Sequence, residues 1–164
     1  MDELDAALVA ELQANARLSN RELADRVGVA PSTALERVRA LRVRGVLRGY
    51  HADVDLGSLG RSVQALIAVR IRPPARDRIE GFRDFARSLP ETAGVFVVSG
   101  GEDFLIHVAV PDTNALYAFV IDRLTERPEV ADVRTSIVYE HIRRPVLEPL
   151  PQASAQASRP TRRR

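Results

Sequence analysis

Several residue types are missing from this chain of 164 residues, and each absence removes a class of function. The chain contains no cysteine, which excludes disulfides, thiol catalysis and cysteine-ligated zinc or iron–sulfur sites. It contains no lysine either, so its basic side chains other than histidine are all arginines. No apolar run approaches the length of a membrane span, and the acidic start Met1–Asp5 is not that of a signal peptide. We therefore expect a soluble cytoplasmic protein without contact to a membrane.

The net charge of +2 is a property of the C-terminal end alone. The last six residues, Arg159–Arg164, carry four arginines, and the rest of the chain has a net charge of −2. Overall basicity is therefore no argument for nucleic-acid binding, which needs a local cluster of positive charge. The 45% content of hydrophobic residues is enough for a folded core.

The stretch Leu18–Tyr50 predicts two short helices joined by a tight turn. Ser19 is a natural N-cap, and Glu22 stands three residues later, where its side chain can return to the backbone N–H of the cap. Gly28 supplies the backbone freedom that ends this helix. A helix, a short glycine turn and a second helix form the helix-turn-helix that reads DNA.

The second helix is predicted to begin at Pro31 and to end at Gly45. Val46 falls where a Schellman ending folds back on Leu41. The buried stripe is expected to comprise Leu35, Val38 and Leu41.

The outward face of that second helix decides between two interpretations. Most short helix pairs are ordinary packed hairpins, but this face carries small hydroxyls near its start and arginines after them, which suit base edges and phosphates. From Arg37 to Arg48 there are five arginines and no acidic residue, which favours DNA binding. The outward and flanking residues are Ser32, Thr33, Glu36, Arg37, Arg39, Ala40 and Arg44.

A third helix precedes this pair. Asp2 is placed to cap it, and an apolar stripe of Leu4, Leu8 and Leu12 runs to about Ala14. Three helices make a small domain where two alone would bury too little.

The pattern changes after Gly45. Val46–Val54 is predicted to be extended, and the glycine-rich stretch Asp55–Gly60 is the candidate domain boundary. Beyond it, apolar periodicities predict the order β-α-β-β-α-β, the ferredoxin-like arrangement of an antiparallel sheet with two helices on one face. The expected strands cover residues 63–71, 95–98, 104–110 and 130–142, with helices over about 75–89 and from 111 on.

The fold class is thus α+β, with a three-helix helix-turn-helix domain over 1–48 and a ferredoxin-like domain over 62–145. Residues 49–61 are expected to form a connecting strand and linker, and 146–164 a disordered basic tail. The face of the sheet without helices is expected to be buried by another surface, and self-association is the simplest way to bury it. The apolar residues expected to require it are Ile67, Val69, Val98 and Ile137.

The order and spacing of these segments resemble the leucine-responsive/asparagine-regulator (Lrp/AsnC) family of transcription regulators. The matching stretches run from about Leu4 to Arg143 and include S-N-R-E-L-A-D-R-V-G, G-V-L-R-G-Y and V-S-G-G-E-D-F-L. The resemblance implies an N-terminal DNA-binding domain, a connecting strand that helps dimerisation, and a C-terminal effector domain of the RAM type. Family members are dimers that often form octamers, and they bind amino acids or related small molecules between dimers.

Carried over by position, the resemblance places the DNA-binding motif at Asn20–Arg39, so that Asn20 and Arg21 join the contact residues above. The effector-binding residues implied are Gly100, Gly101, Asp103, Thr135 and Ser136. A glycine turn exposes backbone N–H and C=O groups to a ligand, and Asp103 would either accept from an ammonium group or cap the hairpin.

Two departures from the family pattern stand out. Ala30 replaces the serine that usually caps the recognition helix, and Glu102 replaces an aromatic residue in the effector loop. A carboxylate there would repel an acidic effector and attract a cationic one.

The rival interpretations are an enzyme of the same two-domain shape and an architectural protein that compacts DNA without an effector. The histidines are His51, His107 and His141, and the second and third are expected on the sheet, where a lone histidine is more often structural. No carboxylate pair, nucleophile elbow or phosphate loop supports catalysis. We therefore predict a DNA-binding regulator of transcription with no catalytic residue, metal or cofactor, whose partners are a two-fold DNA operator, an amino-acid-like effector and further copies of the chain.

Overall fold

The chain folds into two compact units in a computed structural model that describes residues 1–150. The first unit comprises Met1–Ala52 together with the described residues from Arg143 onward, and the second comprises Asp53–Ile142. The chain therefore leaves the first unit, forms the whole of the second, and then returns to the first.

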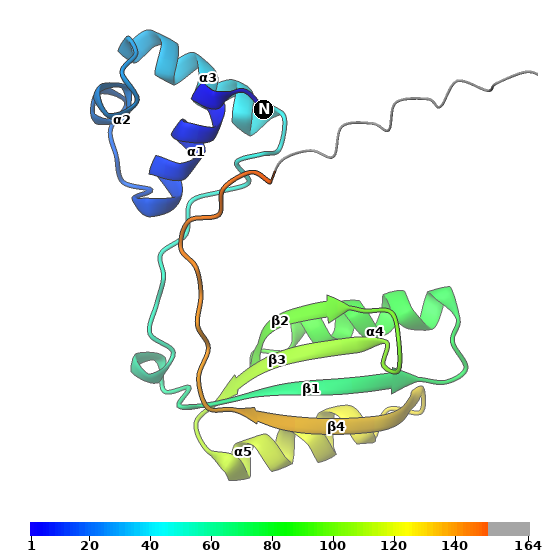
Figure 1. Ribbon diagram of the computed structural model, residues 1–164. Helices are drawn as coiled ribbons and strands as arrows, with labels where there is room; N and C mark the ends of the chain where they lie inside the picture. The colour runs from blue at the N-terminus through cyan, green and yellow to red at the C-terminus, as the bar shows by residue number, and fades with distance from the viewer. Residues whose placement is uncertain (151–164) are drawn as a thin grey trace, which may run out of the picture. The chain divides into compact units, whose positions relative to one another are not determined.

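Three helices make up most of the first unit: α1 (Glu3–Ala14), α2 (Asn20–Val27) and α3 (Pro31–Val43) (Figure 1). The predicted capping box of α2 is confirmed, because the Ser19 N–H donates to the Glu22 carboxylate at 2.8 Å and the Ser19 hydroxyl accepts from the Glu22 N–H at 3.3 Å. Gly28 ends α2 in the left-handed region at φ 72°. Both ends of α2 thus follow from local sequence.

The termini of α3 also follow the sequence. Its N-cap, Ala30, forms no side-chain hydrogen bond, so Pro31 begins the helix without a polar cap. At the other end Gly45 has φ 72°, and the Val46 N–H donates to the Leu41 carbonyl at 2.9 Å, which confirms the predicted Schellman ending.

The core of the first unit is formed by one face of each of its three helices. Ala34, rather than Leu35, joins Val38 and Leu41 in the fully buried stripe of α3, and Leu35 is only partly buried. The small Ala34 side chain lets α3 approach its neighbours closely. The buried residues are Leu8, Leu12, Leu23, Ala24, Ala34, Val38 and Leu41.

The second unit is an antiparallel four-stranded sheet in the order β2-β3-β1-β4. Its strands are β1 (Val63–Ile71), β2 (Thr92–Val97), β3 (Phe104–Val110) and β4 (Val130–Val138). Two helices cover one face, α4 (Arg76–Ser88) and α5 (Thr113–Ala118), the latter continued by a π-helical segment over Phe119–Thr125 (Figure 1). This is the predicted ferredoxin-like arrangement.

The predicted strands differ from the observed ones in β2 and β4. Strand β2 covers Thr92–Val97 and not 95–98, so it begins three residues earlier than predicted. The last strand ends at Val138 and not at Ile142, because Val138 pairs with Gln64 at the start of β1 and the residues beyond it have no neighbour in the sheet. A strand needs such a neighbour for its backbone hydrogen bonds.

The stretch 49–61 forms no strand in the described part of the chain, contrary to the predicted connecting strand. Its only regular element is a short 3₁₀ helix at Gly57–Leu59, which Asp55 begins by accepting from the Ser58 N–H at 2.6 Å and from the Ser58 hydroxyl at 2.7 Å. The physical reason is the same as for β4, since none of the described strands forms a β-ladder with this stretch.

The first few residues of the predicted tail lie on the first unit. The Gln13 side-chain amide of α1 donates to the Leu147 carbonyl at 3.0 Å, and its oxygen accepts from the Leu147 N–H at 3.0 Å. Leu147 of the predicted tail therefore has a defined contact with α1, and residues 151–164 lie outside the described residues.

Candidate functional site

The outward face of α3 is open to solvent. Ser32, Glu36, Arg39 and Ala40 are exposed and Thr33 is partly buried, while Val43 near the end of the helix is 89% exposed. Asn20 and Arg21 are exposed at the start of α2, where unpaired backbone N–H groups favour an anion. The helix-turn-helix thus presents the small hydroxyls and one arginine that sequence reasoning placed there.

The five arginines between Arg37 and Arg48 do not act alike. Two of them turn toward α1: Arg37 Nη1 lies 2.6 Å from Asp2 Oδ2 and 3.3 Å from Asp5 Oδ1, and Arg44 Nη2 lies 2.6 Å from Asp5 Oδ2. Both were predicted to contact DNA, yet the structure gives their guanidinium groups carboxylate partners within the same unit. The predicted contact residues are therefore not brought together as one set.

The other three arginines surround a shallow hollow at the C-terminal end of α3. Arg39, Arg42 and Arg48 line it together with the apolar Val43 and Leu47. None of these arginines forms an ion pair within residues 1–150. The predicted contact residues included Arg39 but not Arg42 or Arg48, because they were chosen from the outward face and one flank of the helix.

The glycine loop predicted to bind an effector joins β2 to β3. Gly100 has φ 132°, a conformation that residues with a side chain rarely adopt. The Gly101 carbonyl accepts from Arg70 of β1, with Nε at 2.6 Å and a second contact from Nη2. One arginine of the sheet therefore holds the loop through a backbone carbonyl.

Asp103 attaches the same loop to the end of β1. Its Oδ2 accepts from the Ile71 N–H at 2.7 Å, and its own N–H donates to the Val69 carbonyl at 3.0 Å. The contact is structural, as in the hairpin-capping role that the sequence left open, but it joins the loop to β1 and not to the hairpin itself.

Glu102 does not leave an unbalanced negative charge in the loop. Its carboxylate forms an ion pair with Arg134 of β4, and Arg134 Nε also lies 3.6 Å from Asp132. The expected repulsion of an acidic ligand is thus offset by a neighbouring guanidinium.

Thr135 and Ser136 are both exposed, but they lie on opposite faces of the sheet. Thr135 pairs with Ile67, which faces the helices, and Ser136 pairs with Leu66 on the other face. Ser136 therefore shares its face with Arg134 and Arg70, which hold the loop, whereas Thr135 does not.

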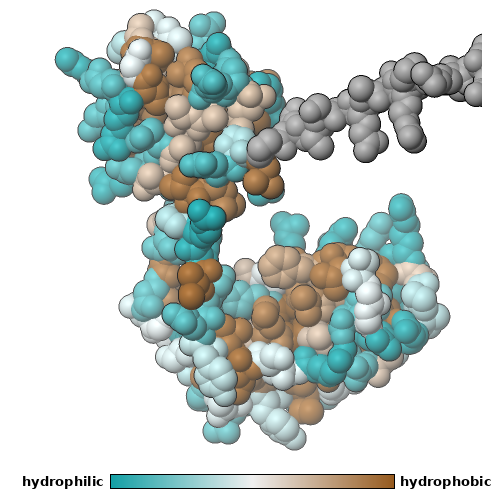
Figure 2. Space-filling model, viewed as in Figure 1, coloured by the Kyte–Doolittle hydropathy of each residue, from teal (hydrophilic) through white to brown (hydrophobic). Residues whose placement is uncertain are grey.

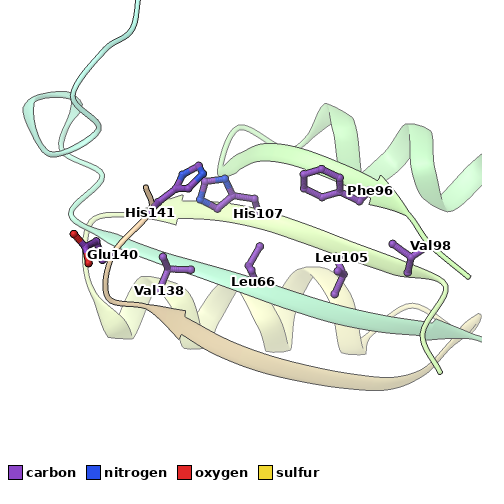
Figure 3. Close-up of a pocket in the computed structure, with 8 residues that line it drawn as sticks. All are labelled: Leu66, Phe96, Val98, Leu105, His107, Val138, Glu140 and His141. Atoms are coloured by element: carbon purple, nitrogen blue, oxygen red, sulfur yellow. The ribbon is translucent and has the colours of Figure 1, made fainter. Parts of the chain in front are cut away.

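The face of the sheet that the helices leave open carries an apolar hollow of about 370 Å³ (Figure 3). Figure 2 shows apolar side chains gathered over this front of the sheet. Ile67 and Val69, which were predicted to need a cover, are fully buried under the helices, because alternate residues of β1 point to opposite faces. The lining residues are Leu66, Phe96, Val98, Leu105, His107, Val138, Glu140 and His141.

Two histidines close one end of this hollow. The His107 ring lies edge-on to His141, with 5.8 Å between the ring centroids, and its Nε2 is 2.9 Å from the Gln64 side-chain oxygen. Burial lowers the pKa of His107 below its usual value, and the neighbouring His141 lowers it further. The sheet-face histidine pair considered in the sequence is therefore present.

Two other kinds of site were searched for in the described residues. Within 1–150 no group of three or more histidine or acidic side chains is arranged to hold a metal ion. In the same residues no helix is both long and apolar enough to cross a membrane.

Comparison with known proteins covers both units. Residues 1–42 match the model of the AsnC-type helix-turn-helix domain, and residues 64–146 match that of the Lrp/AsnC ligand binding domain. A curated relative, the HTH-type transcriptional regulator AldR of Mycolicibacterium smegmatis, is 39% identical over 143 residues, which cover 87% of this chain and 84% of that protein. The leucine-responsive regulatory protein of Escherichia coli is 34% identical over 87% of each chain.

Solved structures agree with these sequence matches. A transcriptional regulator from Neisseria meningitidis, crystallised as a complex with L-methionine, superposes with a TM-score of 0.82 at 35% identity, over 92% of this chain and 96% of that one. The AsnC protein of Escherichia coli superposes with a TM-score of 0.77 at 25% identity, over 92% of this chain and 97% of that one. The curated relatives carry the names of regulators and not of enzymes.

Proposed function

This chain belongs to the Lrp/AsnC family of transcriptional regulators, and we propose that it binds a two-fold DNA operator through α3 and answers to an amino acid at the Ser99–Asp103 loop. We assign DNA binding to residues 1–48 and effector binding to residues 62–145. The observation that carries the proposal is the exposed face of α3, on which small hydroxyls and an unpaired arginine stand side by side.

In this proposal the N-terminal half of α3 enters the major groove. Ser32, Thr33 and Glu36 contact base edges. The carboxylate accepts a hydrogen bond from a cytosine amino group, and the hydroxyls bond with donors or acceptors on the bases. Arg39, with Arg42 and Arg48 beside it, meets the phosphate backbone, and the exposed Val43 lies against the sugars. Asn20 and Arg21 contact phosphates from the start of α2.

The effector we propose is an amino acid. The regulator from Neisseria meningitidis was crystallised with L-methionine, and that relative shares the fold of both units. In this chain Gly100 and Gly101 offer backbone groups to the ligand, and Arg70, which contacts the Gly101 carbonyl, supplies positive charge on the same side for its carboxylate. Ser136 is the hydroxyl on that face, so we favour it over Thr135 as a contact.

We further propose that the open face of the sheet pairs two copies of the chain. Leu66 and Phe96 are 38% and 57% exposed there. The same face of a second copy has an equal area and an equal polarity, so it is the surface that would bury these side chains. Two recognition helices would then be related by a two-fold axis, so the half-sites should be about one helical turn or a multiple apart. Assembly of such dimers into an octamer is the further step that the family resemblance implies.

The decisive experiment is footprinting of the DNA upstream of the protein's own gene, repeated with each of the common amino acids. We expect protection at a few spaced half-sites and a change of affinity with one or a few amino acids. Even coverage of the DNA without any amino-acid response would instead establish an architectural protein.

A variant separates the effector site from the DNA site. Gly100→Arg should abolish the amino-acid response and leave operator affinity unchanged, because the loop lies in the second unit. The matched control is Gly60→Arg, at a glycine outside the loop that also has a positive φ and open space around it. Loss of DNA binding together with the response would mean that Gly100 is needed for folding.

A further inference from the structure

Asp5 is the most deeply buried charged residue of the first unit. It is 2% exposed and lies on the face of α1 that also buries Leu8 and Leu12. A carboxylate in such a place is costly unless it is paired, since water no longer solvates it. Positively charged groups of the unit must therefore pair with the Asp5 carboxylate.

The compensation comes entirely from α3. The two oxygens of Asp5 are divided between Arg37, at 3.3 Å from Oδ1, and Arg44, at 2.6 Å from Oδ2. Arg37 lies within α3 and Arg44 is its C-cap residue, seven residues or two helical turns later, so both side chains leave the same side of the helix. One carboxylate thus holds two points along the recognition helix.

Asp2 completes the arrangement from the end of α1. Its Oδ1 accepts from the Asp5 N–H at 2.8 Å as the helix cap, and its Oδ2 lies 2.6 Å from Arg37. The Arg37 guanidinium and the cap N–H together hold the pKa of Asp2 below its ordinary value. Ion pairs of Asp2 and Asp5 with these arginines therefore connect the start of α1 to one side of α3.

We infer that Asp5 is a positioning residue for DNA recognition, and that Arg37 and Arg44 act through it rather than on DNA. The inference rests on the proposed recognition by α3. Two contacts on one side of a helix prevent it from rolling about its axis, and a roll would turn Ser32, Glu36 and Arg39 away from the groove. The helix needs this support because Ala30 gives its first turn no side-chain cap.

Asp5→Asn tests the inference, because a positioning role and a purely electrostatic role of Asp5 predict opposite changes in operator affinity. Removing a negative charge near DNA should strengthen binding to any sequence. If Asp5 positions α3, operator affinity should instead fall roughly tenfold, the effect of losing a hydrogen bond between charged groups, while affinity for random DNA stays equal or rises. Circular dichroism at the assay temperature establishes that the variant is folded.

Two outcomes of that measurement would overturn the inference. A rise in operator affinity would mean that Asp5 acts only through its charge. An equal loss of affinity for operator and random DNA by the folded variant would mean that Asp5 supports the unit as a whole and not the orientation of α3.

The salt dependence of binding distinguishes the two kinds of arginine. Arg44→Gln should lower operator affinity while the slope of log affinity against log salt is unchanged, whereas the matched Arg39→Gln should reduce the slope by about one. A reduced slope for Arg44→Gln would make it a phosphate contact and overturn the inference. If Arg39→Gln and Arg44→Gln both bind as the wild type does, recognition by α3 is itself wrong, and the positioning role falls with it.

A double variant completes the test and remains informative if either single change destabilises the unit. Once Arg44→Gln is present, adding Asp5→Asn should lower affinity much less than it does in the wild type, because the two residues share one contact. Additive losses would contradict the shared role.

Discussion

At the scale of single residues, the structure assigns to Asp103 a role that the sequence left open. Its carboxylate accepts from the N–H of the fully buried Ile71, so the group fastens the Ser99–Asp103 loop to β1. The sequence could place Asp103 next to the glycines but could not show which donor lay 32 residues away. Long-range partners of this kind also explain why Arg37 and Arg44 were predicted to contact DNA.

Asp103→Ala should lower the free energy of unfolding of the second unit by about 1–3 kcal/mol, because a buried N–H loses its acceptor. Urea unfolding followed by circular dichroism measures the change, with Asp112→Asn at the start of α5 as a control that keeps an oxygen to cap the helix. A variant of unchanged stability that fails to bind the amino acid would show that Asp103 contacts the ligand.

At the scale of helices and strands, elements with local signals were predicted well. The capping box of α2 and the Schellman ending of α3 depend on residues a few positions apart, and both are present. Strand ends depend on distant partners, so β4 was predicted too long. The face of β1 was misassigned for a related reason: both of its faces are apolar in part, and only the positions of α4 and α5 show which one is covered.

The start of α3 offers a stabilising substitution. Ala30 has the extended backbone of an N-cap but no side chain to accept a hydrogen bond. Ala30→Ser should raise the free energy of unfolding of the first unit by about 1 kcal/mol. Thermal unfolding measures this gain, and Ala30→Val, which adds volume without an acceptor, should show none.

The histidine pair makes the sheet sensitive to acid. The pKa of His107 is lowered in the folded state, so the unfolded chain binds its proton first as pH falls. Stability should therefore be full above the ordinary histidine pKa of about 6.5 and should decline as pH falls below it. The groups that face His107 are Gln64 and His141, and Glu140 lines the same hollow.

Melting temperatures of the wild type and of His107→Gln between pH 8 and pH 5 check this expectation. The variant should lose less stability on acidification than the wild type does. His51→Gln, in the stretch before the second unit, is the matched control and should follow the wild type. Identical pH profiles for the wild type and His107→Gln would contradict it.

At the scale of the whole molecule, the proposed pairing of two copies through the open face of the sheet can be tested by one substitution. Phe96→Glu places a charge in the apolar hollow and should raise the dimer dissociation constant roughly a hundredfold or more, because an unpaired charge would be buried. Analytical ultracentrifugation measures the change, and operator affinity should fall with it. Tyr117→Glu, at a 71% exposed position of α5, is the control.

The path of the chain has a practical consequence for exchanging parts between relatives. Among the described residues, 143–150 belong with α1–α3, and Leu147 shares two hydrogen bonds with Gln13. A hybrid regulator made by joining the first 52 residues of one protein to the remainder of another would combine a foreign C-terminal segment with the native α1. A faithful transplant of effector specificity has two junctions, one near Ala52 and one near Ile142, so the donor contributes an insert and the recipient keeps both of its ends.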